Sequence, residues 1–283
     1  MGESALIDYA ARYGKWALVL GGSEGVGRAI AMELAARGMN LALAARRAGP
    51  LAETAELIER THGVQTRTMA LDLGADDVIA RIEAGMGGEE VAFVAYVAAA
   101  EPYGEFIEQD LDAHLNNIAV NVTALTRVTH HFGREMKARG RGGIVVCSSL
   151  SAGVGQHLWV SYAAAKAYGM LLGEGLWYEL KRHGVDACTL MISTTWTESF
   201  QRLAKKIGTV FAEGRTPANL PPGVPVPQLP EDAARNLFAT IDGEWKPVVF
   251  ANPDDIGPWK DLITTPREVM VPAAAEWFGK WLA

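Results

Sequence analysis

Short apolar runs alternate with amphipathic segments along most of the chain. WALVLG (16–21) is a continuous apolar run, and RAIAMELAARG (28–38) after it has helical spacing and ends at a glycine. The alternation continues, with further strands expected at 41–45, 64–71, 91–97, 143–148, 185–192 and 247–251, and further helices at 51–63, 75–84, 109–138, 160–183 and 231–241. Apolar strands that alternate with helices predict a parallel sheet covered on both faces.

Seven strands in this order favour an α/β fold with a doubly wound open parallel sheet, helices on both faces and right-handed crossovers. A barrel of eight strands and helices is the alternative. We expect one domain over residues 1–283. Residues 193–230 break the rhythm and hold six prolines between 217 and 230, which predicts a substrate lid or a disordered insert. The tryptophan-bearing end, PAAAEWFGKWLA, is expected to pack on the domain or contact another subunit.

Composition narrows the class of protein further. Hydrophobic residues make up 49% and charged residues 21%, and the net charge of −7 disfavours nucleic acid as a partner. No run approaches the 18 or so apolar residues of a membrane span, and residues 1–15 lack a secretory signal. Cys147 and Cys188 lie in apolar runs, so we expect them to be buried rather than paired or metal-bound. These features predict a cytoplasmic protein.

A glycine-rich turn follows the first strand and opens the first helix. In LGGSEGVGR (20–28), Gly21 permits a tight turn, Gly25 lets the backbone approach a pyrophosphate, and Gly27 lets the helix pack on the sheet. Amide groups at a helix N-terminus favour phosphate. We therefore expect a dinucleotide to contact Gly21, Ser23, Glu24, Gly25, Val26 and Gly27.

The ends of the next two strands indicate which dinucleotide binds. An acid that would hold ribose hydroxyls is absent after the second strand, where Ala45 is followed by Arg46 and Arg47. A guanidinium suits a 2′-phosphate, so NADP(H) is expected, with a solvated charge pair as the alternative. Asp72 is placed to accept from an adenine amino group or to cap its own turn, and Leu73 beside it is expected to contact the cofactor.

A second group of residues carries the candidate chemistry. Ser149 ends the strand IVVCSS, Tyr162 lies 13 residues later, and Lys166 lies one helical turn beyond it. Asn121 precedes Ser149 in a long helix. Together with the glycine turn, these residues resemble the short-chain dehydrogenase/reductase family, in register from about residue 14 to 200, which implies a Rossmann fold and hydride transfer between a nicotinamide and a carbonyl carbon.

The residue types fit that chemistry. A phenol is a poor base at neutral pH, and the Lys166 ammonium is expected to lower the pKa of Tyr162 so that it works as the acid and base. Ser149 would hydrogen-bond the carbonyl oxygen. The resemblance further implies that Lys166 holds the nicotinamide ribose, that Asn121 holds a relay water, and that no metal takes part.

The stretch YGKWALVLGGSEGVGRAIAMELAARGMNLALAARR resembles the long-chain 3-oxoacyl reductase and 17β-hydroxysteroid dehydrogenase branch. Members of that branch prefer NADPH and act on bulky apolar ketones, and we expect a soluble relative without their membrane spans.

Several positions depart from the family pattern. The usual N-N-A-G is Tyr96, Val97, Ala98 and Ala99, the threonine before the turn is Leu20, and the P-G after strand six is Ile192 and Ser193. Ala98 still leaves room for a cofactor, and Thr195 and Thr197 are expected to supply polar contacts.

Residues between Ser149 and Tyr162 should line the substrate site, with His157 and Trp159 as expected contacts. His157 is expected to shape and solvate the site, with proton transfer as the alternative. Phe200, Leu203 and Phe211 would form an apolar lid or pack on a helix face. The expected activity is NADP(H)-dependent interconversion of a secondary alcohol and a ketone on a mid-sized, mostly apolar molecule such as an aryl ketone, steroid or 3-oxoacyl compound.

Two other functions remain open. A dinucleotide-binding regulatory or scaffold protein is one, because fold does not imply function and the N-N-A-G motif is altered. Another cofactor-assisted reaction, such as dehalogenation or epimerisation, is the other. Loss of Tyr162 would have favoured dehalogenation, and the tyrosine is present. The family resemblance also implies a homodimer or homotetramer that pairs through the long helices at 109–138 and 160–183.

Overall fold

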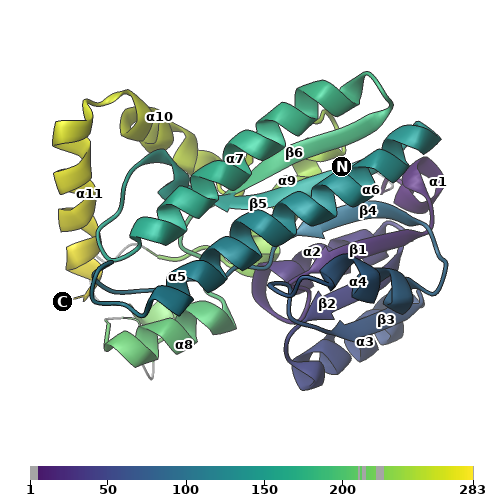
Figure 1. Cartoon of the computed structure of the whole chain (residues 1–283), viewed down its shortest axis with the longest axis horizontal. Coiled ribbons are helices and arrows are strands. Elements are labelled where there is room, and N and C mark those ends of the chain that lie inside the picture. The colour runs from purple at the N-terminus through teal and green to yellow at the C-terminus, as the bar shows by residue number, and fades with distance from the viewer. Residues whose placement is uncertain (1–5, 210, 212–214, 221–225, 283) are drawn as a thin grey trace.

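Seven parallel strands form one sheet in the order β3-β2-β1-β4-β5-β6-β7 (Figure 1). The computed structural model describes residues 6–209, 211, 215–220 and 226–282. The strands are β1 (Trp16–Leu20), β2 (Asn40–Ala45), β3 (Thr66–Ala70), β4 (Val91–Tyr96), β5 (Gly142–Ser149), β6 (Val185–Ile192) and β7 (Val248–Phe250). The predicted doubly wound open sheet is confirmed, and the barrel alternative is wrong.

Helices cover both faces of this sheet. They are α1 (Tyr9–Tyr13), α2 (Gly25–Ala36), α3 (Ala48–His62), α4 (Val78–Met86), α5 (Leu111–Ile118), α6 (Leu125–Arg139), α7 (Val160–Lys181), α8 (Glu198–Ile207), α9 (Pro230–Ile241), α10 (Ile256–Thr264) and α11 (Arg267–Leu282). Residues of α2, α3 and α9 form one hydrophobic core, and residues of α4, α6 and α7 form the other. The central strands β1 and β4 are buried along their whole length, which explains their uninterrupted apolar sequences.

The long helix expected at 109–138 is interrupted in its middle. A π-helical segment, Ala119–Ala124, joins α5 to α6 and contains Asn121. One extra residue per turn at this point changes the helical phase, and such π-segments are frequent at functional sites. The apolar periodicity on either side is helical, so it gave no sign of the interruption.

The described residues of the segment expected as a lid pack against the domain. It contains α8 and a short 3₁₀ turn, Pro217–Asn219, while residues 210, 212–214 and 221–225 lie outside the described part of the chain. An isolated bridge between Thr195 and Gln228 closes its base. Trp196, Phe200 and Phe211 meet edge to edge with ring centroids 5.2 to 6.3 Å apart, so the expected apolar lid residue Phe211 packs within the segment itself.

The C-terminal helices lie beside the segment that follows β5. A Cβ on Gly153 would meet Trp259 and Leu262 of α10 at 2.6 Å, and Arg267 of α11 donates to the Gly153 carbonyl. Figure 1 shows α8, α10 and α11 grouped at the end of the molecule where α7 begins. The tryptophan-bearing end, which was expected to pack on the domain, forms the C-terminal part of α11. The side chains of residues 278–283 lie outside those described.

Two smaller expectations were also tested. Cys147 and Cys188 are both buried and free, as predicted. Among the described residues, no helix is both long enough and apolar enough to cross a membrane.

Candidate active site

The strand order reverses between β1 and β4, so the helices that follow these two strands lie on opposite faces of the sheet. Open α/β sheets bind ligands at such a switch point. The glycine turn leaves β1 at this edge, and Ser149 ends the neighbouring strand β5 at the same edge. The sheet topology therefore gathers the two motifs that the sequence placed far apart.

Close backbone packing explains the glycines of the turn. Gly21 has φ +89°, and a Cβ on Gly27 would lie 2.0 Å from the carbonyl oxygen of Gly21. The first turn of α2 lacks a side-chain cap of its own, because Glu24 at the N-cap makes no capping hydrogen bond. Instead the Gly25 N–H donates to the Glu198 carboxylate at 3.0 Å. The turn thus holds an anionic oxygen, which fits the phosphate expected there.

The other predicted cofactor contacts of this half lie around the turn. Ser23 and Val26 are buried beside it. Arg46 is exposed, and Arg47 forms an ion pair with Glu24. Hydrogen bonds from Arg202 and Arg47 lower the pKa of Glu24 overall, although burial alone would raise it.

Asp72 and Leu73, which were predicted to contact the cofactor, make contacts within the protein. Asp72 accepts a hydrogen bond from the Gly74 N–H at 2.9 Å, which is the local capping alternative. The side chain of Leu73 is buried in the core under β3, because the chain turns inward after Asp72. A ligand at this position would meet only the backbone of Leu73.

The candidate catalytic side chains meet between β5 and α7. Tyr162 and Lys166 lie in the first two turns of α7, and the Lys166 Nζ is 5.6 Å from the centroid of the Tyr162 ring. Nζ donates to the carbonyl of Cys147 at 3.1 Å, and the lysine is buried. Ser149 hydrogen-bonds the Tyr162 phenol and also bonds Ser151. The spacing therefore brought Ser149, Tyr162 and Lys166 into one group, as predicted.

The expected effect of Lys166 on the phenol is wrong in this structure. The pKa of Tyr162 lies well above its usual value of 10, because burial disfavours the phenolate and the negative charge of Glu101 adds to that effect. The hydrogen bond from Ser149 opposes both. The lysine ammonium is turned to the Cys147 carbonyl, so it does not offset the desolvation.

Asn121 is held firmly by its neighbours. Its Oδ1 accepts from the Ala100 N–H at 2.9 Å, and its Nδ2 donates to the Ala100 carbonyl at 2.8 Å and to Asn117. The amide therefore ties the π-segment to the chain after β4. Only one lone pair of Oδ1 remains for the predicted relay water.

Tyr96 ends β4 and stands where the family usually has the first asparagine of N-N-A-G. It supplies a second contact between the end of β4 and the π-segment. Its hydroxyl donates to the Val120 carbonyl at 2.6 Å, inside the π-segment. Ala98 donates its N–H to the Leu20 carbonyl and lies against Gly21, where a Cβ would meet it at 2.7 Å. These contacts show how the chain fills the place of the altered N-N-A-G motif.

Thr195 and Thr197, which were predicted to supply polar contacts to the cofactor, hydrogen-bond to other residues of the lid. Thr195 donates to the Ser193 carbonyl and accepts from Gln228 at 3.1 Å. Thr197 caps α8 by accepting from the Phe200 N–H at 3.0 Å, and its methyl group lies over Gly25. Thr197 keeps its hydroxyl proton, so it remains able to donate.

The predicted substrate contacts flank the entrance to the site. His157 is exposed, and the Trp159 indole packs edge-on against Tyr103 and donates to Glu101 at 2.9 Å. Leu158 between them has φ +66°, a strained conformation for a residue with a side chain. Its carbonyl accepts from the Gly104 N–H at 2.9 Å, which joins this loop to the loop after β4.

Three residues that lie against the candidate site escaped the sequence analysis. Glu101 faces the Tyr162–Lys166 pair, and burial against the site raises its pKa while Trp159 and Lys166 oppose the rise, although the residue still contacts solvent. Ser148 donates to the Lys166 carbonyl at 2.7 Å and fixes α7 on β5. Glu198 reaches the glycine turn from α8. Their partners are distant in sequence, so no local motif marked them.

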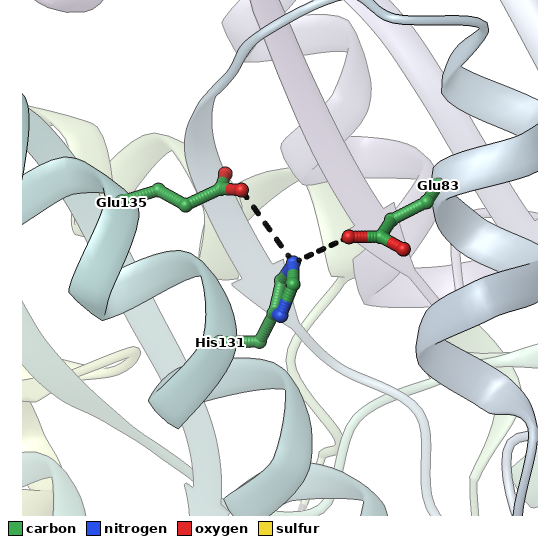
Figure 2. A group of neighbouring side chains, drawn as sticks. All are labelled: Glu83, His131 and Glu135. Atoms are coloured by element: carbon green, nitrogen blue, oxygen red, sulfur yellow. Dashed lines mark ion pairs between the residues drawn. The ribbon is translucent and has the colours of Figure 1, made fainter.

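A group of possible metal ligands lies elsewhere. Among the described residues, Glu83 of α4 meets His131 and Glu135 of α6 (Figure 2). The His131 Nε2 is 3.0 Å from Glu83 and 3.6 Å from Glu135, so two carboxylates pair with the ring. All three are partly exposed on the outer side of the helices, and the group takes no part in the site at the strand ends.

Comparisons with known proteins identify the family of the chain. The short chain dehydrogenase family matches residues 15–208, which is more than half of the chain. The chain belongs to the short-chain dehydrogenase/reductase family, whose members are oxidoreductases that use a nicotinamide dinucleotide.

Relatives place it among particular members of the family. It is 32% identical to a 7β-hydroxysteroid dehydrogenase of Clostridium sardiniense over 69% of this chain and 74% of that protein. It is 28% identical to one of Collinsella aerofaciens over 88% and 91%. The very-long-chain 3-oxoacyl-CoA reductase of Mus musculus is 33% identical over 68% of this chain and 62% of that protein.

Solved structures share the whole fold. A structure described for 7β-hydroxysteroid dehydrogenase stereoselectivity aligns with a TM-score of 0.82 at 25% identity, over 95% of this chain and 99% of that one. A short-chain dehydrogenase from Sphingobium yanoikuyae in complex with NADPH aligns with a TM-score of 0.75 at 22% identity, over 88% and 91%.

Proposed function

We propose that this protein interconverts a secondary alcohol and a ketone with NADP(H), on a mid-sized and mostly apolar substrate. The observation that carries the proposal is the meeting of Ser149, Tyr162 and Lys166 at the strand edge next to the glycine turn. A hydrogen-bonding hydroxyl, a proton donor and a buried cation suit a carbonyl oxygen that gains negative charge.

Each residue has a distinct task. A bound nicotinamide dinucleotide supplies or accepts the hydride. Ser149 donates a hydrogen bond to the substrate oxygen and orients it. Tyr162 donates its proton to that oxygen during reduction and takes it back during oxidation. Lys166, fixed by the carbonyl of Cys147, places its remaining N–H donors beside Tyr162 and binds ribose hydroxyls.

NADP(H) is proposed over NAD(H) because of the charge at the end of β2. Arg46 and Arg47 follow Ala45 where an acid would hold a bare ribose. Arg46 points to solvent and makes no ion pair among the described residues, so its guanidinium is free for a 2′-phosphate. The structural neighbour that carries NADPH supports this choice as an analogy of fold.

A bulky ring system is the proposed substrate class, with steroids first and 3-oxoacyl compounds and aryl ketones as the wider set. The relatives named for 7β-hydroxysteroid and very-long-chain 3-oxoacyl substrates support it. The aromatic pair Tyr103 and Trp159 at the entrance supports it as well.

The same proposal covers the organisation of the chain. We propose one domain whose segment 193–230 is a substrate lid, with the described part of it resting on the glycine turn. A homodimer or homotetramer is proposed through α5, α6 and α7, where Leu115, Leu171 and Tyr178 are exposed. The two free cysteines agree with a reducing compartment such as the cytosol.

A dinucleotide-binding regulatory protein is the second candidate. The observations that favour it are the altered N-N-A-G motif and the raised pKa of Tyr162, which both depart from an optimised site. Intact Ser149, Tyr162 and Lys166 favour the enzyme, because a sensor needs none of them.

The experiment is a steady-state assay with NADPH and NADH against steroid ketones, 3-oxoacyl thioesters and aryl ketones. We expect turnover with NADPH and a preference for the steroid group. The variant Arg46→Ala should lose about 2 kcal/mol of NADPH binding, roughly thirtyfold, and leave NADH binding unchanged. Tight NADPH binding without turnover on any ketone would favour the regulatory protein instead.

A further inference from the structure

The lid helix α8 places a carboxylate on the phosphate-binding turn. The Glu198 Oε2 accepts from the Gly25 N–H at 3.0 Å, and its Oε1 pairs with the Arg28 Nη2 at 3.0 Å. Gly25 and Arg28 are the first and fourth residues of α2. A negative group therefore occupies the position where the helix N-terminus attracts anions.

Two further contacts hold α8 in that place. Arg202, one helical turn after Glu198, forms a bidentate ion pair with Glu24, with its Nη1 3.0 Å from Oε2. The Thr197 methyl group lies so close to Gly25 that a Cβ there would meet it at 2.8 Å. The backbone of the turn is thus covered by the lid as well as bonded to it.

This arrangement competes with the cofactor of the proposed function. A pyrophosphate on the Gly25 N–H needs the space and the donor that Glu198 uses, and two negative groups in one place repel each other. We propose that Glu198 is a carboxylate gate, which occupies the pyrophosphate position and must swing away, with α8, before the dinucleotide binds. Its departure also frees Arg28 to face the pyrophosphate.

The inference rests on the proposed function, since the gate has meaning only if a dinucleotide binds at the turn. It goes further, because it assigns to residues of the lid a control over cofactor entry. Glu198 acts on the pyrophosphate, which NADPH and NADH share. Arg46, which is exposed, acts on the 2′-phosphate alone. The two effects are therefore separable by comparing the two dinucleotides.

The test is equilibrium binding of NADPH and NADH to the full chain, followed by fluorescence, in the wild type and in Glu198→Gln. Glutamine keeps the shape and an acceptor for the Gly25 N–H but removes the charge. We expect both dinucleotides to bind roughly three- to tenfold more tightly, as the loss of a helix-terminus charge and a partly exposed ion pair predicts. Glu179→Gln, an exposed carboxylate of α7, is the matched control and should change neither affinity.

Rapid mixing supplies a second readout. If the gate must open first, the observed binding rate of the wild type levels off as NADPH increases, and it levels off at a higher rate in Glu198→Gln. Affinity unchanged within twofold, or weakened, in Glu198→Gln overturns the gate while the proposed function stands. Absence of dinucleotide binding in every folded variant, wild type included, contradicts the proposed function and the gate together.

Discussion

Burial and the side chains of Glu101 and Ser149 set the protonation of Tyr162. Burial and the charge of Glu101 raise its pKa, and the hydrogen bond from Ser149 lowers it. A raised pKa keeps the proton on the phenol through the neutral range, so the group is ready to act as an acid. If Tyr162 is the proton donor, as proposed, these surroundings keep it in the acid form that ketone reduction needs.

A pH profile follows from that direction. We expect kcat/KM for reduction to stay level from pH 7 into the alkaline range, because the acid form of Tyr162 persists there. The value for oxidation should rise with pH over the same range, because it needs the phenolate. Glu101→Gln removes one cause of the raised pKa, so its oxidation limb should move to lower pH.

Glu105→Gln is the control for this series, because Glu105 is an exposed carboxylate in the same loop. It should leave both profiles in place. A reduction profile that falls with rising pH already near neutrality, or an oxidation limb that Glu101→Gln leaves unmoved, would contradict the assigned surroundings of Tyr162.

At the scale of elements, the turn between β1 and α2 depends on Gly27. An alanine methyl at this position would lie 2.0 Å from the Gly21 carbonyl oxygen, so strand and helix must separate. We expect Gly27→Ala to lose about 2 kcal/mol of unfolding free energy, and to weaken dinucleotide binding strongly. Urea unfolding and NADPH titration measure the two effects.

Gly49→Ala in α3 is the matched control, since a methyl there meets nothing within 4 Å. It should leave binding unchanged and stabilise the fold by about 0.5 kcal/mol through the unfolded chain. Equal stability losses in the two variants would show that the packing at Gly27 is not special.

A buried ion pair ties three helices together far from the site. Arg37 at the end of α2 pairs with Glu33 at 2.5 Å and with Asp242 after α9 at 2.6 Å, and the Tyr9 hydroxyl of α1 donates to Asp242 at 2.7 Å. Asp242→Ala leaves a buried guanidinium without its main partner. We expect a loss of about 3 kcal/mol in denaturant unfolding.

Asp232→Ala breaks an exposed pair with Arg235 on α9 and should cost less than about 0.5 kcal/mol. If Asp242→Ala proved equally mild, the cluster would not hold the helices as described.

The alternation of strands and helices was predictable because buried parallel strands are continuously apolar. The insert at 193–230 was also recognisable from its composition, because it contains six prolines. The π-segment was hidden, since its residues keep helical spacing on both sides of Asn121. The contact of Glu198 with Gly25 joins positions 173 residues apart, and the tie from Tyr96 to Val120 depends on the paths of β4 and the π-segment. Only the folded chain fixes such contacts.

The candidate site shows the same division. Spacing placed Ser149, Tyr162 and Lys166 together, because a strand end and a helix start meet at one sheet edge. The direction of the Tyr162 pKa was predicted wrongly, because it depends on burial and on Glu101, which lies on another loop. For Asp72, the sequence left an adenine contact and a local cap both open, and the folded chain shows the cap.

At the scale of the molecule, the outer side of α5 and α7 is unusually apolar. Leu171 and Tyr178 of α7 are 61% and 78% exposed, and Leu115 of α5 is 50% exposed. Apolar side chains in such numbers on neighbouring helices favour association with a second copy. We expect Leu171→Glu to weaken the dimer at least about tenfold, because a carboxylate in an apolar contact costs more than 1.4 kcal/mol.

Analytical ultracentrifugation over a concentration series measures that change. Leu6→Glu, an exposed apolar residue before α1, is the control and should leave association unaltered. Association that persists unchanged in Leu171→Glu would move the interface to another surface.

The account as a whole depends on Tyr162 as the proton donor. The measurement that tests it most directly is a paired one on Tyr162→Phe, in which NADPH binding and ketone reduction are recorded on the same preparation. We expect NADPH to bind within twofold of the wild type, and reduction to fall at least about a hundredfold, as the loss of a general acid predicts. Reduction that stays within tenfold of the wild type while NADPH binds normally would contradict the account.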